Sequence, residues 1–191
     1  MNLNRLVLTN STVFKIFFVS VFATALTAKA ENNLPTSLSI ADKKLELNGK
    51  AFRTATLFNV KVYEAGLYLE KKSHNEKEIL ASRDSKAILL FPLRDISRED
   101  TVKAWQYSFE KNCAEDCETL KDEIRKFEEK LVAFKGGDKY RYVFSESGAS
   151  QFINEKEVFQ TTNVSFSKLL LSTWIGRSPP TESLKKQFLG D

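Results

Sequence analysis

Residues 53–70 constrain the fold more than any other part of the chain. Between residues 58 and 62 every second residue is apolar, which is the pattern of a β-strand with one buried face. Beyond Gly66 the apolar positions change parity, and a shift by one residue at a glycine predicts a β-bulge there. The stretch therefore predicts strand structure with an irregularity at Gly66.

Two polar side chains in this stretch, Arg53 and Tyr63, are the candidate binding groups. An unbroken strand would hold them roughly 33 Å apart. They can contact one ligand only if the chain reverses between them, and Asn59 tolerates turn geometry. We therefore predict a hairpin that turns near Phe58-Asn59 and places Arg53 opposite Tyr63. The alternative is a surface ion pair for Arg53 and a core position for Tyr63.

Residues 1–30 have the pattern of an export signal. Arg5 and Lys15 supply positive charge, residues 16–26 form a short and mostly apolar run, and Ala28-Lys29-Ala30 matches the small-x-small cleavage pattern. The run is shorter than the roughly 20 apolar residues that a membrane span needs. We predict cleavage after Ala30 and a periplasmic location, with an uncleaved amphipathic anchor as the alternative.

Removing this segment changes the charge of the chain. The formal charge falls from +4 to +1, because the segment holds three basic residues and no acid. A nucleic-acid-binding domain normally keeps a basic surface, so this class of function is disfavoured. Residues 31–191 are enough for one domain with its own core, and no linker or repeat divides them.

Short alternating runs predict further strands. We expect them at 38–40, 45–47, 87–93 and 140–144 and around Phe152 and Val158. The Asn48-Gly49 pair is a tight-turn signal, and the run at 87–93 is apolar enough to be buried on both faces.

Apolar stripes at helical spacing predict helices between these strands. Helices are expected from Asn75 through Leu80, from Ser97 through Phe109, at 120–131 with an end at Gly136-Gly137, at 166–174 with Gly176 as cap, and after Thr181. The sequence thus predicts about six or seven strands, mainly antiparallel. The helices are segregated into blocks along the chain, which is typical of an α+β fold.

The sequence offers little for metal or nucleophilic chemistry. Its single histidine, His74, falls in a polar loop, and no cluster of His, Cys and carboxylates has ligand spacing. No serine lies in a G-x-S-x-G motif. Cys113 and Cys117 predict a disulfide in an exported protein, which requires a break between the helices that flank them.

Four segments resemble the chalcone isomerase-like family, and most closely its exported bacterial branch. They are L-E-L-N-G-K-A-F-R at 45–53, V-K-V-Y-E-A-G-L-Y-L-E at 60–70, L-R-D-I-S at 93–97, and L-L-S-T-W-I-G-R-S-P-P-T-E-S-L-K-K-Q-F-L-G at 170–190. The resemblance implies an open-faced β-sandwich. In this fold a large antiparallel sheet carries a helical layer on one side, with a ligand cleft between them.

The resemblance also implies where ligand-binding residues lie. The family's catalytic arginine matches Arg53 and its strand threonine falls at Tyr63. Its helical tyrosine falls at Thr101, its helical asparagine at Ser108, and its threonine near the C-terminal helix at Thr173. Three of the five positions depart from the isomerase pattern. Loss of the tyrosine and asparagine shortens the hydrogen-bonding groups that isomerisation needs, so chalcone isomerisation is disfavoured.

Tyr63 resembles the equivalent residue of the fatty-acid-binding members of the family, in which an arginine and this tyrosine hold a carboxylate. We therefore predict a non-catalytic protein that binds a fatty acid or similar amphipathic carboxylate and needs no cofactor. Three alternatives remain open: an isomerase or lyase for an enone-type substrate, haem or tetrapyrrole binding, and a structural role without a ligand.

Overall fold

The computed structural model describes residues 34–190 except 56–57, 59 and 114–116. These residues belong to one compact unit, 32–191. The predicted signal segment and most of the predicted turn at Phe58-Asn59 lie outside the described residues. Within the described part, no helix is long and apolar enough to cross a membrane.

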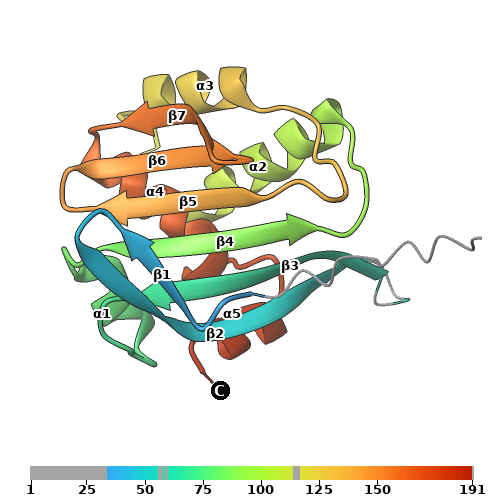
Figure 1. The fold of residues 1–191 in the computed structure, drawn as a ribbon. Helices are drawn as coiled ribbons and strands as arrows, with labels where there is room; N and C mark the ends of the chain where they lie inside the picture. The colour runs from blue at the N-terminus through green and yellow to red at the C-terminus, as the bar shows by residue number, and fades with distance from the viewer. Residues whose placement is uncertain (1–33, 56–57, 59, 114–116, 191) are drawn as a thin grey trace, which may run out of the picture. The chain divides into compact units, whose positions relative to one another are not determined.

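The fold is built on a seven-stranded antiparallel sheet whose strands follow one another in chain order (Figure 1). The strands are β1 Ser37–Ile40, β2 Lys43–Ala55, β3 Val60–Leu69, β4 Lys86–Pro92, β5 Tyr140–Ser145, β6 Gly148–Ile153 and β7 Lys156–Thr161. Strand β4 is buried on both faces, as predicted. The predicted α+β class with a large antiparallel sheet is confirmed.

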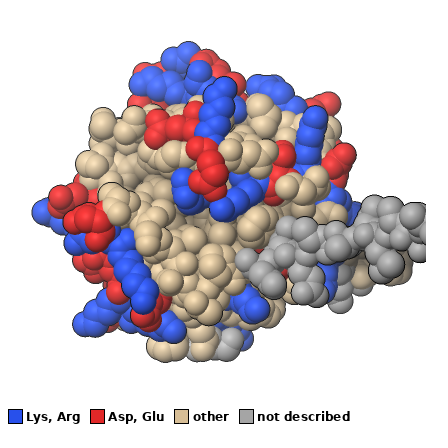
Figure 2. Space-filling model, in the orientation of Figure 1, with Lys and Arg blue, Asp and Glu red and all other residues tan. Residues whose placement is uncertain are grey.

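Helices cover one face of this sheet, which we call the inner face (Figure 1). They are α1 Glu76–Ala81, α2 Arg98–Asn112, α3 Lys121–Lys130, α4 Val164–Ile175 and α5 Glu182–Phe188. The main core lies between this face and the helices. A smaller apolar cluster on the opposite, outer face includes Leu45, Tyr68 and Leu89. Figure 2 shows the outer face, where a broad area without charged side chains lies among mixed charges.

The β-bulge of strand β3 lies at Val62, and the prediction of a bulge at Gly66 is wrong. Arg53 pairs with Tyr63 and Thr54 pairs with Lys61, so Val62 is the extra residue, while pairing continues without interruption through Gly66. The parity of the inner face therefore changes between Val62 and Tyr63. The change is hidden in the sequence because this strand is also buried on its outer face farther along.

A second register shift falls between Leu47 and Gly49 of β2, where a tight turn was predicted. The strand continues through this pair because the Asn48 side chain satisfies neighbouring backbone groups. Its Nδ2 donates to the carbonyls of Ser73 (3.0 Å) and Phe188 (2.8 Å), and its Oδ1 accepts from the Ser73 N–H. Helix α5 then packs so closely on β2 that a Cβ at Gly49 would lie 1.9 Å from a backbone oxygen.

The predicted helix starts are confirmed by their caps. Asn75, Ser97 and Thr181 each accept a backbone N–H of the first turn of their helix. Helix α3 ends at Lys130, six residues before the predicted end at Gly136, because the following chain pairs with another segment. Its last carbonyls are bound by the Arg98 side chain, and Phe134 forms a β-bridge with Ile96.

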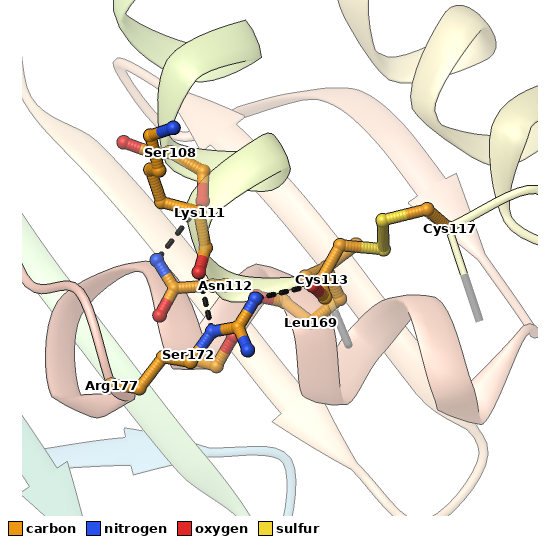
Figure 3. The surroundings of a disulfide bond; sticks show 8 residues. All are labelled: Ser108, Lys111, Asn112, Cys113, Cys117, Leu169, Ser172 and Arg177. Carbon is orange, nitrogen blue, oxygen red and sulfur yellow. Dashed lines mark hydrogen bonds between the residues drawn. A yellow bond between two sulfur atoms is a disulfide. The ribbon is translucent and has the colours of Figure 1, made fainter. Parts of the chain in front are cut away.

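The predicted disulfide joins Cys113, which caps the end of α2, to Cys117 (Figure 3). Helix α2 ends at Asn112, so the break that the disulfide requires is present. Arg177 follows α4 and donates to the carbonyls of Lys111 and Cys113 (Figure 3). Asn112 also exchanges two hydrogen bonds with the backbone of Ser178. These contacts fasten the end of α2 to the turn between α4 and α5.

Candidate functional site

A cavity of about 680 Å³ lies between the inner face of β2–β4 and helices α2 and α4. Its volume is within the range of ordinary small-molecule sites. Helix α2 contributes one continuous face, on which Ser97, Thr101, Ala104 and Ser108 follow one another at helical spacing. The predicted cleft between sheet and helical layer is therefore present.

All five residues predicted to bind a ligand line this cavity. Arg53 comes from β2 and Tyr63 from β3, Thr101 and Ser108 come from α2, and Thr173 comes from α4. Arg53 and Tyr63 lie directly opposite each other in the ladder, as the hairpin prediction required. The bulge at Val62 makes this possible, because it turns Tyr63 to the inner face that Arg53 already occupies.

Arg53 is a half-buried cation whose donors are not engaged. No hydrogen bond or ion pair joins its guanidinium to another residue that the structure describes. A guanidinium carries five N–H donors and no acceptor, so it favours an anionic partner. The interpretation of Arg53 as a surface ion-pair residue is not supported among the described residues.

Tyr63 is a buried and neutral hydrogen-bond donor. Burial raises the pKa of its phenol to about 12, which outweighs the lowering by the nearby Arg53 charge. The phenol keeps its own proton at neutral pH and can donate it to a ligand beside Arg53.

The hydroxyl groups on the helices differ in what they can offer. Thr101 donates to the carbonyl of Ser97 (2.9 Å) and Thr173 donates to that of Leu170 (2.8 Å), so both are left as acceptors. The Ser108 hydroxyl makes no hydrogen bond to a described residue. Direct donors to an anion are therefore Arg53, Tyr63 and Ser108, with the two threonines in a supporting position.

The rest of the interior is apolar and aromatic. Val62, Leu90 and Phe134 line the walls. Trp105 and Trp174, the two tryptophans of the chain, both line the cavity with ring centroids 5.3 Å apart. They belong to a cluster of packed rings in the core, which holds the inner end of the cavity in place.

The cavity opens among charged residues at the start of α2. Arg94, Asp95, Asp100, Lys103 and Tyr107 line this part and are exposed. Sequence reasoning missed Arg94 and assigned Trp174 only to the core. Arg94 lies inside the segment 93–97 that carried a family resemblance, which was the available signal. Trp174 lies inside the segment 170–190 that also carried the resemblance, but its helical apolar spacing indicated only a core position.

His74 does not line the cavity. Its Nδ1 lies within hydrogen-bonding distance of the Leu189 carbonyl, at the corner where α5 ends. The described lining holds no His, Cys or Met side chain, so it offers a haem iron no imidazole, thiolate or thioether ligand. In the described part of the chain no three His, Cys, Asp or Glu side chains are grouped to hold a metal ion.

Comparisons with known proteins agree with this architecture. A search of curated proteins found no match. Among solved structures, a fatty-acid binding protein of Arabidopsis thaliana superposes with a TM-score of 0.61 at 15% identity, over 82% of this chain and 90% of that one. This likeness shows a shared fold. The model of the family described as chalcone isomerase-like matches residues 26–190. The chain therefore belongs to the chalcone isomerase-like family.

Proposed function

We propose that this protein is a non-catalytic binding protein for a fatty acid or a similar amphipathic carboxylate. The observation that carries the proposal is the donor pair on the inner face of the sheet. The guanidinium of Arg53, which has no partner among the described residues, faces a neutral phenol, Tyr63, at the wall of an apolar cavity. The carboxylate binds at this pair and the acyl chain lies along the apolar lining.

The chemistry of the pair suits a carboxylate better than a neutral group. Arg53 can hold both carboxylate oxygens through two parallel N–H donors, and Tyr63 adds a third donor without a second charge to desolvate. Burial of the acyl chain contributes about 0.8 kcal/mol for each methylene removed from water. Specificity therefore comes from the head group and most of the affinity from the chain.

The fold likeness supports the proposal independently. The Arabidopsis protein with the same fold is described as a fatty-acid binding protein. The two sequences are only 15% identical, so the chemistry of the cavity is the main argument for the ligand. The Arabidopsis protein adds a precedent for fatty-acid binding by this fold.

We also propose that the protein is exported to the bacterial periplasm. The charged and apolar pattern of residues 1–30 supports this location. The Cys113–Cys117 disulfide is a second support, because disulfides persist mainly in oxidising compartments. N-terminal sequencing of the protein from its native host tests the proposal. A mature chain that begins at Glu31 is expected, and an intact N-terminus would contradict cleavage.

An isomerase or lyase acting on an enone-type substrate is the second candidate function. The same observation favours it, because a guanidinium and a neutral phenol side by side can stabilise a developing enolate oxygen. Turnover of an enone that disappears in Arg53→Ala would establish this candidate in place of simple binding.

The test of the proposed function is a binding titration with hexadecanoic acid, monitored by tryptophan fluorescence. Both tryptophans line the cavity, so a bound ligand must change their emission. Arg53→Ala is expected to lower the affinity by at least tenfold, since a hydrogen-bonded charge pair is worth roughly 1.5–3 kcal/mol. Arg83→Ala is the matched control, because Arg83 is exposed and lies outside the cavity.

Native mass spectrometry of the protein purified without detergent complements the titration. A bound mass that is present in the parent and absent in Arg53→Ala identifies the ligand class. If Arg53→Ala binds the acid as tightly as the parent, the proposed head-group site is wrong.

A further inference from the structure

The cavity carries a second cation that has no partner among the described residues. Arg94 lies two residues beyond β4 and lines the cavity where it opens. No hydrogen bond or ion pair joins its guanidinium to a residue that the structure describes. By contrast Lys103, the third basic side chain of the lining, pairs with Glu99 at 2.7 Å.

The two acidic residues of the lining are engaged elsewhere. Asp95 accepts the Gly136 N–H through Oδ1 (2.8 Å), and Asp100 accepts the Ser97 hydroxyl through Oδ2 (2.9 Å). Neither carboxylate is within ion-pair distance of Arg94, although both lie along the same opening. The charges at the opening cancel formally, so a ligand would recognise Arg94 through direct contact and not through a long-range field.

The register of the sheet sets the approximate separation of the backbone positions that carry the two guanidinium groups. Arg53 pairs with Tyr63, and Tyr63 pairs with Pro92 on the next strand. Neighbouring strands lie about 4.8 Å apart and each residue adds about 3.3 Å along the chain, so the Cα atoms of Arg53 and Arg94 are roughly 12 Å apart. The lining near them is apolar and includes Val62 and Leu90.

We propose that the ligand of this cavity carries two anionic groups, one at each end of an apolar chain. The first carboxylate binds to Arg53 and Tyr63, and the second pairs with Arg94 at the opening. The chemical class is therefore a medium-chain dicarboxylic acid. This inference rests on the proposed function and specifies its substrate class, because a monocarboxylic acid held at Arg53 would leave Arg94 without a partner in the ligand or among the described residues.

The test compares decanedioic acid with decanoic acid by isothermal titration calorimetry at low salt. Parent protein, Arg94→Gln and the exposed control Arg83→Gln are titrated with both acids. The measured quantity is the ratio of the two Kd values in each protein, which cancels effects common to both ligands. Arg94→Gln is expected to reduce the relative preference for decanedioic acid by about two- to fivefold, the size of a solvent-accessible ion pair. The ratio in Arg83→Gln should equal that of the parent.

Two results would overturn the inference and leave the proposed function standing. One is an unchanged ratio in Arg94→Gln with clear binding of decanoic acid. The other is an equal dependence on Arg94 for decyl phosphate, whose two charges sit on one group, because both guanidinium groups would then converge on a single head group. If the parent binds hexadecanoic acid but neither ten-carbon acid, the inference also fails and the proposed function stands; if it binds none of the three acids, both fail.

Discussion

Replacing Tyr63 with phenylalanine removes one hydroxyl group from the cavity and keeps the ring. The phenol is buried and its pKa is raised to about 12. Its proton is therefore available to a carboxylate at neutral pH. A hydrogen bond to a charged group contributes roughly 1.5–3 kcal/mol, so Tyr63→Phe should raise the Kd for hexadecanoic acid by about ten- to 150-fold.

The methyl ester of the same acid separates head-group recognition from packing. The ester keeps the acyl chain and loses the charge, so its Kd should rise by only about two- to tenfold in Tyr63→Phe. Tryptophan fluorescence follows both titrations. Tyr107→Phe is the matched control, since Tyr107 also lines the cavity but is 60% exposed at its opening. We expect less than a threefold change in this control, because water replaces any bond that its hydroxyl makes.

The variant itself must be checked for folding, because Tyr63 belongs to the buried core cluster. Urea unfolding compares the free energy of unfolding of Tyr63→Phe with that of the parent. If a folded Tyr63→Phe variant loses affinity equally for acid and ester, or keeps the affinity of the parent for the acid, the phenol does not bind the carboxylate.

Three further predictions concern stability and are measured by urea unfolding. Gly49→Ala places a Cβ 1.9 Å from the α5 backbone and should lower the free energy of unfolding by about 1–3 kcal/mol. In the control Gly136→Ala the new Cβ meets nothing closer than 3.6 Å, so the change should be nearly neutral. Equal effects of the two substitutions would contradict the close approach at Gly49. The pKa of Tyr63 rises from 10.0 to about 12 on folding, so the folded state holds its proton more tightly. Its contribution, about 3 kcal/mol, is complete below pH 10 and lost as the pH rises towards 12, and Tyr63→Phe should unfold less steeply with pH than the parent. An equal slope in both proteins would refute that assignment. The Cys113→Ser/Cys117→Ser variant removes a cross-link between residues four apart, so its free energy of unfolding should fall by about 2 kcal/mol by the chain-entropy estimate. Its ligand affinity should stay within threefold of the parent, and a loss of binding would show that the disulfide shapes the cavity.

Much of the local structure could be predicted from the sequence. The caps at Asn75, Ser97 and Thr181 and the alternating run in β5 depend on interactions within a few residues of the chain. The family and its fold were also recognisable, because four segments of the chain carry the resemblance and the family model matches residues 26–190. The pairing of Arg53 with Tyr63 was predicted on the hypothesis that both contact one ligand, since only a chain reversal can bring them together, and the ladder confirms that pairing.

The errors fall where long-range contacts decide the backbone. Asn48-Gly49 has the composition of a turn, yet the Asn48 side chain binds the backbone of Ser73 and Phe188 and keeps the strand continuous. Helix α3 stops early because Arg98 takes up its last carbonyls. These partners are distant in the sequence, so no local pattern reports them.

The sequence by itself determined the type of the main elements, the family, and five of the residues that line the candidate site. Only the tertiary structure decided how that site can work. Burial on both faces hides the parity of β3, so the bulge at Val62 that turns Tyr63 towards Arg53 becomes visible only in the ladder. The proton on Tyr63 and the lack of a partner for Arg53 among the described residues depend on desolvation and on neighbours brought from other elements. Sequence periodicity records which face of an element is apolar, and the packing of several elements sets the charge and hydrogen bonding of a buried group.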